Sequence, residues 1–198
     1  MTTRREFLKA AAASALPVVV AAMPLDRGPS LPRGMAVRAV LIDARHAHAR
    51  TVGERLVGSG ASVLALPVGD VTRIWLDTIG PAWKREALAV AGLTERPALF
   101  CLEQLAFECG LRVVFHGEHV LHPGGQTEHR LVRGAAAAGL AAPDLNRAGP
   151  RWPALIAAAI ATYREPAYRV RVGPSEAALG PALPPRAQLL TSWIIAPV

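Results

Sequence analysis

The sequence has little lysine and no long basic run, and this scarcity excludes one class of partner. Of its 22 lysines and arginines, only Lys9 and Lys84 are lysine, and the arginines are spread along the chain singly or in pairs. Nucleic-acid-binding domains usually gather their cations into a patch or stripe, often with aromatic residues between them, and no such stripe is present in the sequence. We therefore predict no nucleic-acid partner, although the formal net charge is +7.

Several cofactor and catalytic motifs are also absent from the sequence. It contains no P-loop, no Gly-x-Ser-x-Gly elbow and no His-Glu-x-x-His pair. A dinucleotide fingerprint needs glycines between the first strand and the first helix, and the turn Asp43 to Ala49 has none. The glycines of Gly58-Ser59-Gly60 lie at the other end of the expected helix. The motifs therefore identify no cofactor.

Only two cysteines occur, Cys101 and Cys109. If residues 98–109 form one helix, a rise of about 1.5 Å per residue puts their Cα atoms about 12 Å apart. A disulfide requires less than about 7 Å. We expect two buried, unpaired thiols. A nucleophilic role is not favoured, because neither cysteine has an adjacent base.

The N-terminus carries the most specific pattern in the chain. Thr3-Arg4-Arg5-Glu6-Phe7-Leu8-Lys9 precedes an apolar run from Ala10 to Ala22. The segment resembles the signal peptides of the twin-arginine translocation (Tat) pathway, whose pattern is Ser/Thr-Arg-Arg-x-Phe-Leu-Lys. The resemblance rests on Arg4, Arg5, Phe7, Leu8 and Lys9 in particular and does not extend beyond this segment.

The physical properties of this segment agree with a signal peptide. Its cations form a positive region, and the 13 residues from Ala10 to Ala22 are too few to span a hydrocarbon core of about 30 Å. Val20-Ala21-Ala22 suits a signal peptidase, so we expect a signal peptide at 1–22, a linker at 23–35 and a single α/β domain at 36–198. An amphipathic N-terminal helix and an uncleaved membrane anchor are the alternatives.

The resemblance implies a location and a partner. A Tat signal implies a protein that folds before export, uses the Tat translocase as a partner and ends in the periplasm or outside the cell. No later segment reaches about 18 uninterrupted apolar residues, so we expect no stable membrane span after cleavage. A protein exported in this way can also travel with another exported protein.

The domain is predicted to be α/β, with a mixed sheet of about five strands that begins with a βαβ unit. Residues 37–43 and 61–66 read as strands, and 51–57 reads as the helix between them, closed by glycines. The strands of such a unit are parallel. We expect helices to pack on the sheet.

The rest of the chain supplies further elements. The expected helices are 70–77, 94–109 and 152–163, and Gly80-Pro81 is expected to end the first of them. Residues 83–92 are expected to be irregular. Residues 134–149 and 164–186 are expected to be connections. The remaining expected strands are 111–116, 127–132 and 188–195. Pro123-Gly124-Gly125 predicts a hairpin between the third and fourth strands.

The first candidate site lies where the two parallel strands end. In open α/β sheets the ligand crevice lies beyond the carboxyl ends of the strands. Asp43, Arg45, His46 and His48 follow the first strand and Asp70 follows the second, so these side chains could converge in one crevice. The candidate catalytic residues there are Asp43, His46, His48 and Asp70. The alternative is that Asp43 and Asp70 only cap the following helices while the histidines lie exposed in a first helical turn.

The second candidate site lies on the hairpin. His116, Glu118, His119 and His129 carry side chains that first-row metals accept as ligands. Alternation along a strand places His116 and Glu118 on one face and His119 on the other, so an intact strand cannot direct all of them to one ion. His129 lies opposite either Val120 or His119, depending on the turn. Histidines on a solvated hairpin face are the alternative.

The sequence therefore leaves three functional hypotheses. The first is a Tat-exported accessory or binding component of an exported complex. The second is a hydrolytic or metal-assisted enzyme that uses the strand-end Asp/His cluster. The third is a small metal-binding protein that uses the hairpin histidines.

Overall fold

The structure is a computed structural model that describes residues 37–135, 138–164 and 183–198. The expected signal peptide (1–22) and linker (23–35) lie outside the described residues, as does most of the 164–186 connection. Within the described ranges, no helix combines the length and the apolar character needed to cross a membrane.

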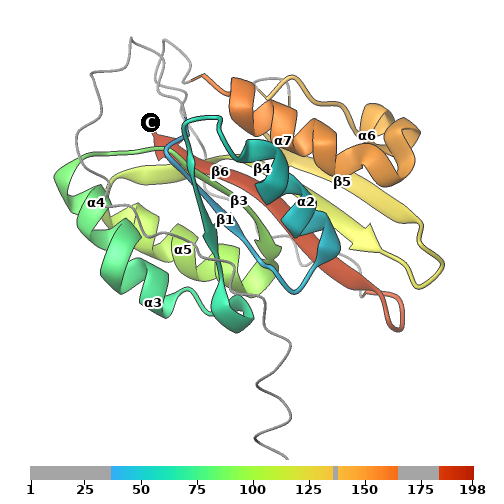
Figure 1. Ribbon diagram of the computed structural model, residues 1–198, viewed down its shortest axis with the longest axis horizontal. Helices are drawn as coiled ribbons and strands as arrows, with labels where there is room; N and C mark the ends of the chain where they lie inside the picture. Colours follow the sequence, from blue (N-terminus) through green and yellow to red (C-terminus); the bar gives the residue numbers. More distant parts are fainter. Residues whose placement is uncertain (1–36, 136–137, 165–182) are drawn as a thin grey trace, which may run out of the picture.

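Six strands form one mixed sheet in the order β2-β1-β3-β6-β4-β5 (Figure 1). Their bounds are β1 Ala39–Ile42, β2 Ser62–Ala65, β3 Val90–Glu95, β4 Leu111–Leu121, β5 Thr127–Arg133 and β6 Gln188–Pro197. Strand β1 runs parallel to β2 and β3, whereas β6 is antiparallel to β3 and β4, and β5 is antiparallel to β4. The predicted α/β class and its opening βαβ unit are confirmed, with one strand more than expected.

Helices cover both faces of the sheet (Figure 1). Their bounds are α2 Ala47–Leu56, α3 Thr72–Ile74, α4 Gly80–Arg85, α5 Arg96–Glu108, α6 Ala142–Ala148 and α7 Trp152–Thr162. Helices α2, α6 and α7 pack on one face around buried Trp152, and α4 and α5 pack on the other around buried Trp193. The strands at the centre of the sheet are therefore buried on both faces. In β1, for example, Val40 is buried on one face and Leu41 on the other.

Strand β3 was not predicted, and its residues were assigned partly to an irregular segment and partly to the start of a helix. Residues Val90 to Thr94 are all buried, because β3 lies between β1 and β6. A central strand buried on both faces shows no polar alternation, and Ala91 and Gly92 add little strand propensity. The helix that was predicted from Thr94 begins instead at Arg96, with Pro97 in its first turn.

The prediction that Gly80-Pro81 ends a helix is also wrong. The helical rod continues from Thr72 to Arg85 through a π-helical turn at Trp75–Ile79. Proline normally clashes with the carbonyl four residues earlier, and a wider turn before it relieves this conflict. A Cβ at Gly80 would lie 2.9 Å from the Trp75 carbonyl oxygen, so glycine permits this close turn.

A β-bulge in the long strand β4 shifts the alternation of its side chains between the two faces of the sheet. Val113 pairs with Ile195 of β6 and Phe115 pairs with Ile194, which leaves Val114 as an extra residue. Val113 therefore packs in the α5 layer, whereas Phe115 packs in the α7 layer. The alternation that follows sends His119 toward α7 and Glu118 toward the α5 side.

Two smaller expectations also need correction. The 134–149 connection contains the short helix α6, whose only fully buried apolar side chain is Leu145. Both cysteines are free thiols, but they are not both buried: Cys101 is exposed and Cys109 is half-buried. Cys101 lies on the outer side of α5, opposite the stripe of Leu99, Leu102 and Ala106 that faces the core.

Candidate functional site

The strand-end site is built from two neighbouring parallel strands. Ile42, the last residue of β1, pairs with Leu93 of β3, and the Asp43 N–H donates to the Leu93 carbonyl oxygen at 3.2 Å. Asp43 follows β1 directly, and Glu95 is the last residue of β3. Because parallel strands end at the same edge of the sheet, the two carboxylates come to the same place.

Arg45 joins these carboxylates. Its Nε and Nη2 donate to Oδ1 and Oδ2 of Asp43 at 2.9 and 2.6 Å, a bidentate pair, and Nη2 also lies 3.0 Å from Oε2 of Glu95. The Asp43 side chain is completely buried, whereas 43% of the Arg45 side chain is exposed. A buried carboxylate is therefore neutralised by a cation that reaches it from solvent.

His46 completes the group. It precedes α2 as the N-cap residue, and its Nε2 lies 3.0 Å from Oε1 of Glu95 and 3.9 Å from Oδ2 of Asp43. One donor atom each from Asp43, His46 and Glu95 lies within 4.8 Å of the others, and in the described part of the chain these three form the group of possible metal ligands. The sequence offered no signal for Glu95, because β3 was not recognised.

The charge of Asp43 is maintained by its neighbours. Burial on its own would raise the pKa of Asp43, but the hydrogen bonds and positive charge of Arg45, with His46 nearby, outweigh burial and lower the pKa. The same carboxylate raises the pKa of Arg45. Asp43 is therefore an anion across the physiological pH range.

A buried polar network holds the end of β3 in position. The Trp193 indole N–H donates to Thr94 Oγ1 at 3.0 Å, and the Thr191 hydroxyl donates to the Thr94 carbonyl oxygen at 3.1 Å. Thr94, Thr191 and Trp193 are all completely buried. The backbone that carries Glu95 is thus fixed by strand β6.

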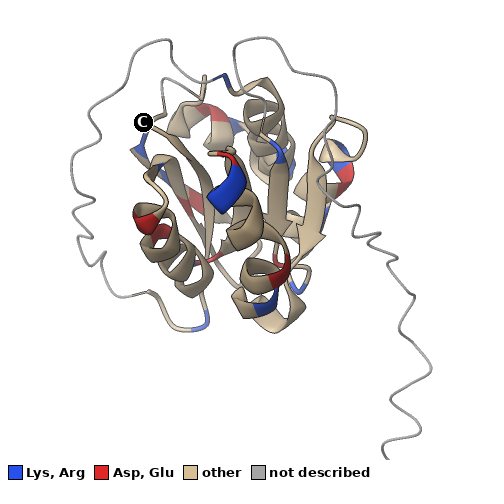
Figure 2. Cartoon of the chain, turned by 90° about the vertical axis from the view of Figure 1, so that its left-hand side faces the viewer, with Lys and Arg blue, Asp and Glu red and all other residues tan. Residues whose placement is uncertain are grey.

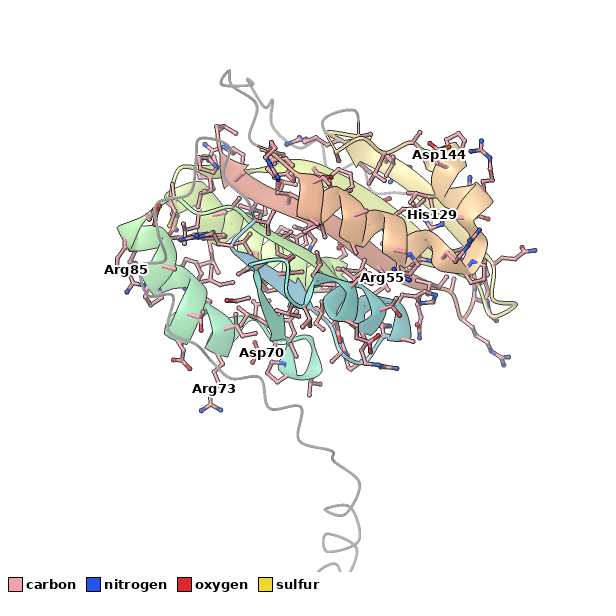
Figure 3. The ribbon with its side chains drawn as sticks, turned by 45° about the horizontal axis from the view of Figure 1, so that its top comes forward. Arg55, Asp70, Arg73, Arg85, His129 and Asp144 are labelled. Atoms are coloured by element: carbon pink, nitrogen blue, oxygen red, sulfur yellow. The ribbon has the colours of Figure 1, made fainter. Side chains whose placement is uncertain are left out.

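Two of the predicted strand-end residues do not join this group. Asp70 is exposed, and its Oδ1 accepts the Thr72 N–H at 2.8 Å, which is the capping role weighed as the alternative. Figure 3 shows Asp70 beside the start of α3. His48 turns away toward α7, where its ring stacks on Trp152 at 5.2 Å. The structure thus brings together Asp43, Arg45 and His46.

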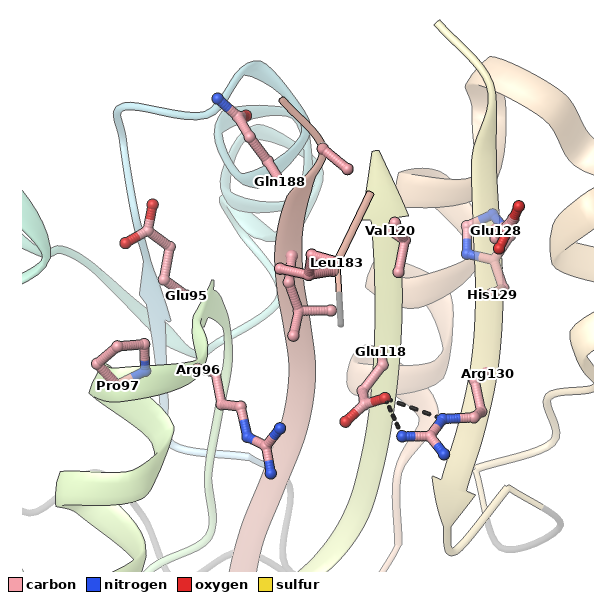
Figure 4. A pocket seen from close by; sticks show the side chains of 12 residues that line it. Glu95, Arg96, Pro97, Glu118, Val120, Glu128, His129, Arg130, Leu183 and Gln188 are labelled. Atoms are coloured by element: carbon pink, nitrogen blue, oxygen red, sulfur yellow. Dashed lines mark hydrogen bonds and ion pairs between the residues drawn. The ribbon is translucent and has the colours of Figure 1, made fainter. Parts of the chain in front are cut away.

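A groove of about 760 Å³ opens beside the cluster, on the side of the sheet that α5 covers only in part. Glu95 lies on its wall, next to Arg96 and Pro97 at the start of α5; the other walls come from β4, β5, β6 and the residues before β6 (Figure 4). Val120, Leu183 and Leu189 give it an apolar part. Ligand sites of small molecules commonly have this size and mixture of linings.

Each acid that lines the groove lies close to a basic side chain, whereas one lining cation has no acid beside it. Glu118 accepts the Arg130 Nε–H at 2.9 Å, Glu128 lies 3.1 Å from His122, and Glu95 is held by Arg45 and His46. Arg96 makes no hydrogen bond or ion pair with any described residue. Figure 4 shows its side chain extending into the groove on the side opposite the Glu118–Arg130 pair. The groove therefore offers one uncompensated cation.

The hairpin histidines separate according to the face of the sheet. His119 lies directly opposite His129, the second of the two registers considered, and their Nδ1 atoms are 2.7 Å apart. His119 Nε2 lies 2.8 Å from the Ser192 hydroxyl, and its ring stacks on Trp152 at 4.4 Å. Both nitrogens of the buried His119 are thus in use within the layer beneath α7.

Burial keeps these imidazoles neutral. Desolvation lowers the pKa of His119 well below its ordinary value, with a further contribution from His129, and lowers that of His129 to about 4. Desolvation also lowers the pKa of His48. Three neutral imidazoles therefore surround Trp152. Ser192 and His119 are both completely buried, so this hydroxyl cannot meet a substrate.

The other two hairpin residues lie on the opposite face. Glu118 bonds Arg130 at the groove, and His116 pairs across the sheet with Arg133. Desolvation lowers the pKa of His116, and Glu118 opposes this shift. The structure thus brings together His119 and His129 and places His116 and Glu118 apart from them; metal binding by these four residues stays a prediction.

Figure 2 shows basic and acidic residues interspersed along the ribbon of the described residues. No family model, no curated protein and no solved structure matches this chain.

Proposed function

We propose that this chain is an exported binding protein, an accessory component of an exported complex, and that its groove takes a small ligand with one carboxylate and an apolar body. The export part of the proposal is supported by Arg4, Arg5 and the apolar segment after them. The binding part is supported by a single observation: Arg96 is the one lining arginine without a counter-charge among the described residues.

The chemistry of the groove selects this ligand class. An arginine bonds a carboxylate through two N–H groups, and such charge-assisted bonds are stronger than neutral ones. The α5 N-terminus beside Arg96 adds backbone N–H groups and favours negative charge. Pro97, Val120 and Leu189 can cover an alkyl or ring portion of the ligand. Figure 4 shows the cation and the apolar side chains on the same groove.

Binding is tested with the protein isolated from periplasm, using octanoate and octanol as probes in isothermal titration calorimetry. We expect octanoate to bind more tightly than octanol. Arg96→Gln should weaken octanoate about ten- to a hundredfold, the equivalent of a charged hydrogen bond, and leave octanol unchanged. Arg85→Gln on α4 is the matched control and should change neither. Equal octanoate affinity in Arg96→Gln and wild type would overturn the proposal.

Export and complex formation are tested separately. Replacing Arg4 and Arg5 with lysine should leave the protein in the cytoplasm, and cell fractionation would show this. Affinity purification from periplasm should bring down a second exported protein in stoichiometric amount. Recovery of the chain alone, as a monomer, would count against the accessory role.

Hydrolysis is the second candidate. It is favoured by one observation: His46 Nε2 lies 3.0 Å from Glu95, a residue that also lines the groove, so a carboxylate-oriented imidazole stands beside a ligand space. The probe is p-nitrophenyl octanoate. Turnover above that of the His46→Gln variant would support hydrolysis, and equal rates for the two proteins would exclude His46 as its base.

A further inference from the structure

We propose that Asp43, His46 and Glu95 form a site for a divalent first-row transition ion, and that the Arg45 side chain occupies this site as an exchangeable counter-ion. The inference stands apart from the proposed ligand groove, because it uses other side chains and shares only Glu95 with it. The sequence suggested metal ligands on the hairpin and did not indicate these three residues as a set.

The donor set suits such an ion. Two carboxylate oxygens and one imidazole nitrogen are ligands that Zn²⁺ and Mn²⁺ accept, and three protein ligands leave positions open. Ligands about 2.1 Å from one ion lie about 3.0 to 3.4 Å from each other at tetrahedral or octahedral angles. The His46–Glu95 separation of 3.0 Å already matches, and the His46–Asp43 separation of 3.9 Å needs only a small closure.

The scaffold around the donors is rigid where a site needs it. Asp43 has no exposed side-chain surface, and 10% of the His46 side chain is exposed. His46 is fixed at the start of α2, where its N–H donates to the Asp43 carbonyl oxygen at 3.0 Å. Glu95 follows the buried Thr94. The ligands therefore come from two strand ends and a helix start rather than from one loop.

Arg45 provides the second observation for a cation site. One of its terminal nitrogens lies 2.6 Å from Asp43 and 3.0 Å from Glu95, so a positive group already bridges the two acids. A divalent ion placed between the same oxygens would neutralise both carboxylates. Burying the Asp43 charge without any cation would be costly, so metal entry and arginine departure must be coupled.

The geometry also allows Arg45 to leave. Its side chain is 43% exposed, so the guanidinium can rotate into water without unfolding the core. By contrast, Asp43 and His46 cannot move without disturbing β1 or α2. The arginine is thus the mobile partner in the exchange.

The proposed exchange predicts that some variants lower the Zn²⁺ affinity and another raises it. Zn²⁺ affinity is measured by calorimetry on the purified protein after it has been stripped of metal. Glu95→Gln and His46→Gln should each lower the affinity at least tenfold. Arg45→Gln should raise it about tenfold, because no internal cation then competes. Mg²⁺, which prefers an all-oxygen octahedral set, should bind weakly throughout.

Matched controls separate this site from the other histidines. His48→Gln and His129→Gln should leave Zn²⁺ affinity unchanged, because these rings lie around Trp152. Arg96→Gln should also retain Zn²⁺, so failure of the ligand proposal would leave this one standing. Zn²⁺ loss in His129→Gln with retention in His46→Gln would overturn the inference in favour of the hairpin. Unchanged or weaker binding in Arg45→Gln would overturn the counter-ion role, and absence of Zn²⁺ binding in wild type would overturn both.

Discussion

His119 and His129 face each other across β4 and β5 with their Nδ1 atoms 2.7 Å apart. At this distance one Nδ1 must carry the proton and the other must accept it, so the two rings cannot both be cationic in this geometry. The pair is thus a partly buried contact that requires at least one neutral imidazole.

The first prediction concerns pH. The pKa of His129 is lowered to about 4 in the folded protein, against about 6.5 when unfolded. Between these values the unfolded chain binds the proton and the folded chain does not, so the free energy of unfolding should fall as pH falls from about 6.5 toward 4. Since His129 is partly exposed, we expect a contribution of only about 1–2 kcal/mol.

The measurement is urea unfolding at pH 7.5, 5.5 and 4.5 for wild type and His129→Gln. Wild type should lose more stability than the variant over this range, because the variant lacks the titrating ring. Identical pH dependence in the two proteins would contradict a neutral His129 in the folded protein.

The second prediction concerns the other nitrogen of the same ring. Ser192→Ala removes the hydroxyl 2.8 Å from His119 Nε2 and leaves that buried nitrogen without its partner. The variant should be less stable by about 1–3 kcal/mol, as measured by urea unfolding at neutral pH. Ser192→Cys keeps the size of serine better than Ser192→Thr, which adds a methyl group. The stability of Ser192→Cys should lie between that of Ser192→Ala and that of wild type. Equal stability of Ser192→Ala and wild type would show that the contact between Ser192 and His119 does not stabilise the protein.

The third prediction concerns Trp152, which contacts the rings of His48, His119 and His129. It is 1% exposed, so Trp152→Ala should cost about 3–5 kcal/mol. Trp152→Phe keeps an aromatic face for the imidazoles and should cost less. Thermal unfolding monitored by circular dichroism gives both values, and equal losses for Ala and Phe would argue against a role for ring stacking.

The fourth prediction concerns Gly92, in the middle of β3. A Cβ at this position would lie 2.4 Å from the Trp193 ring and 2.8 Å from the Leu41 carbonyl oxygen. Gly92→Ala should therefore destabilise the protein by about 1–3 kcal/mol through overpacking and change the near-ultraviolet signal of tryptophan. Gly124→Ala is the control, since a Cβ there meets nothing within 4 Å. Equal stability of the two variants would mean that β3 and β6 are not packed this closely.

The fifth prediction concerns the thiols. Cys101 is exposed and Cys109 is half-buried, and both are free. The protein purified without reductant should react with two equivalents of Ellman's reagent, first at Cys101 and more slowly at Cys109. Cys101→Ser should remove the fast phase. Fewer than one reactive thiol per chain without denaturant or reductant would indicate that the cysteines are oxidised.

The sequence predicted those parts of the fold in which local pattern and burial agree. Helix α7, the β4–β5 hairpin and the β1–α2–β2 unit all have clear periodicity or turn residues at their ends. Strand β3 was missed because Val90-Ala91-Gly92-Leu93 is buried on both faces and has the same composition as a helix or a loop. The prediction that Pro81 ends a helix failed for a different reason. A π-helical turn before Pro81 accommodates the proline, and no sequence pattern indicates that turn.

The candidate site was predicted in part. Asp43 and His46 were identified because they follow the first strand, but their partner Glu95 depends on β3 and is 49 residues from His46 in the chain. Whether His46 and His48 point together could not be decided from spacing: they flank Ala47 at the helix start, and one bonds Glu95 while the other stacks on Trp152. The partner of each histidine is set by tertiary packing.

The bulge at Val114 takes up the one residue by which β4 exceeds β6 between Val113 and Phe115. Pairing the same residues without a bulge would turn the later half of the strand over, placing Glu118 against Trp152 and His119 in the groove. Deleting Val114, by contrast, would make Phe115 the direct neighbour of Val113 and leave both on their present faces. The bulge thus keeps the groove face and the core face of β4 in phase with β6.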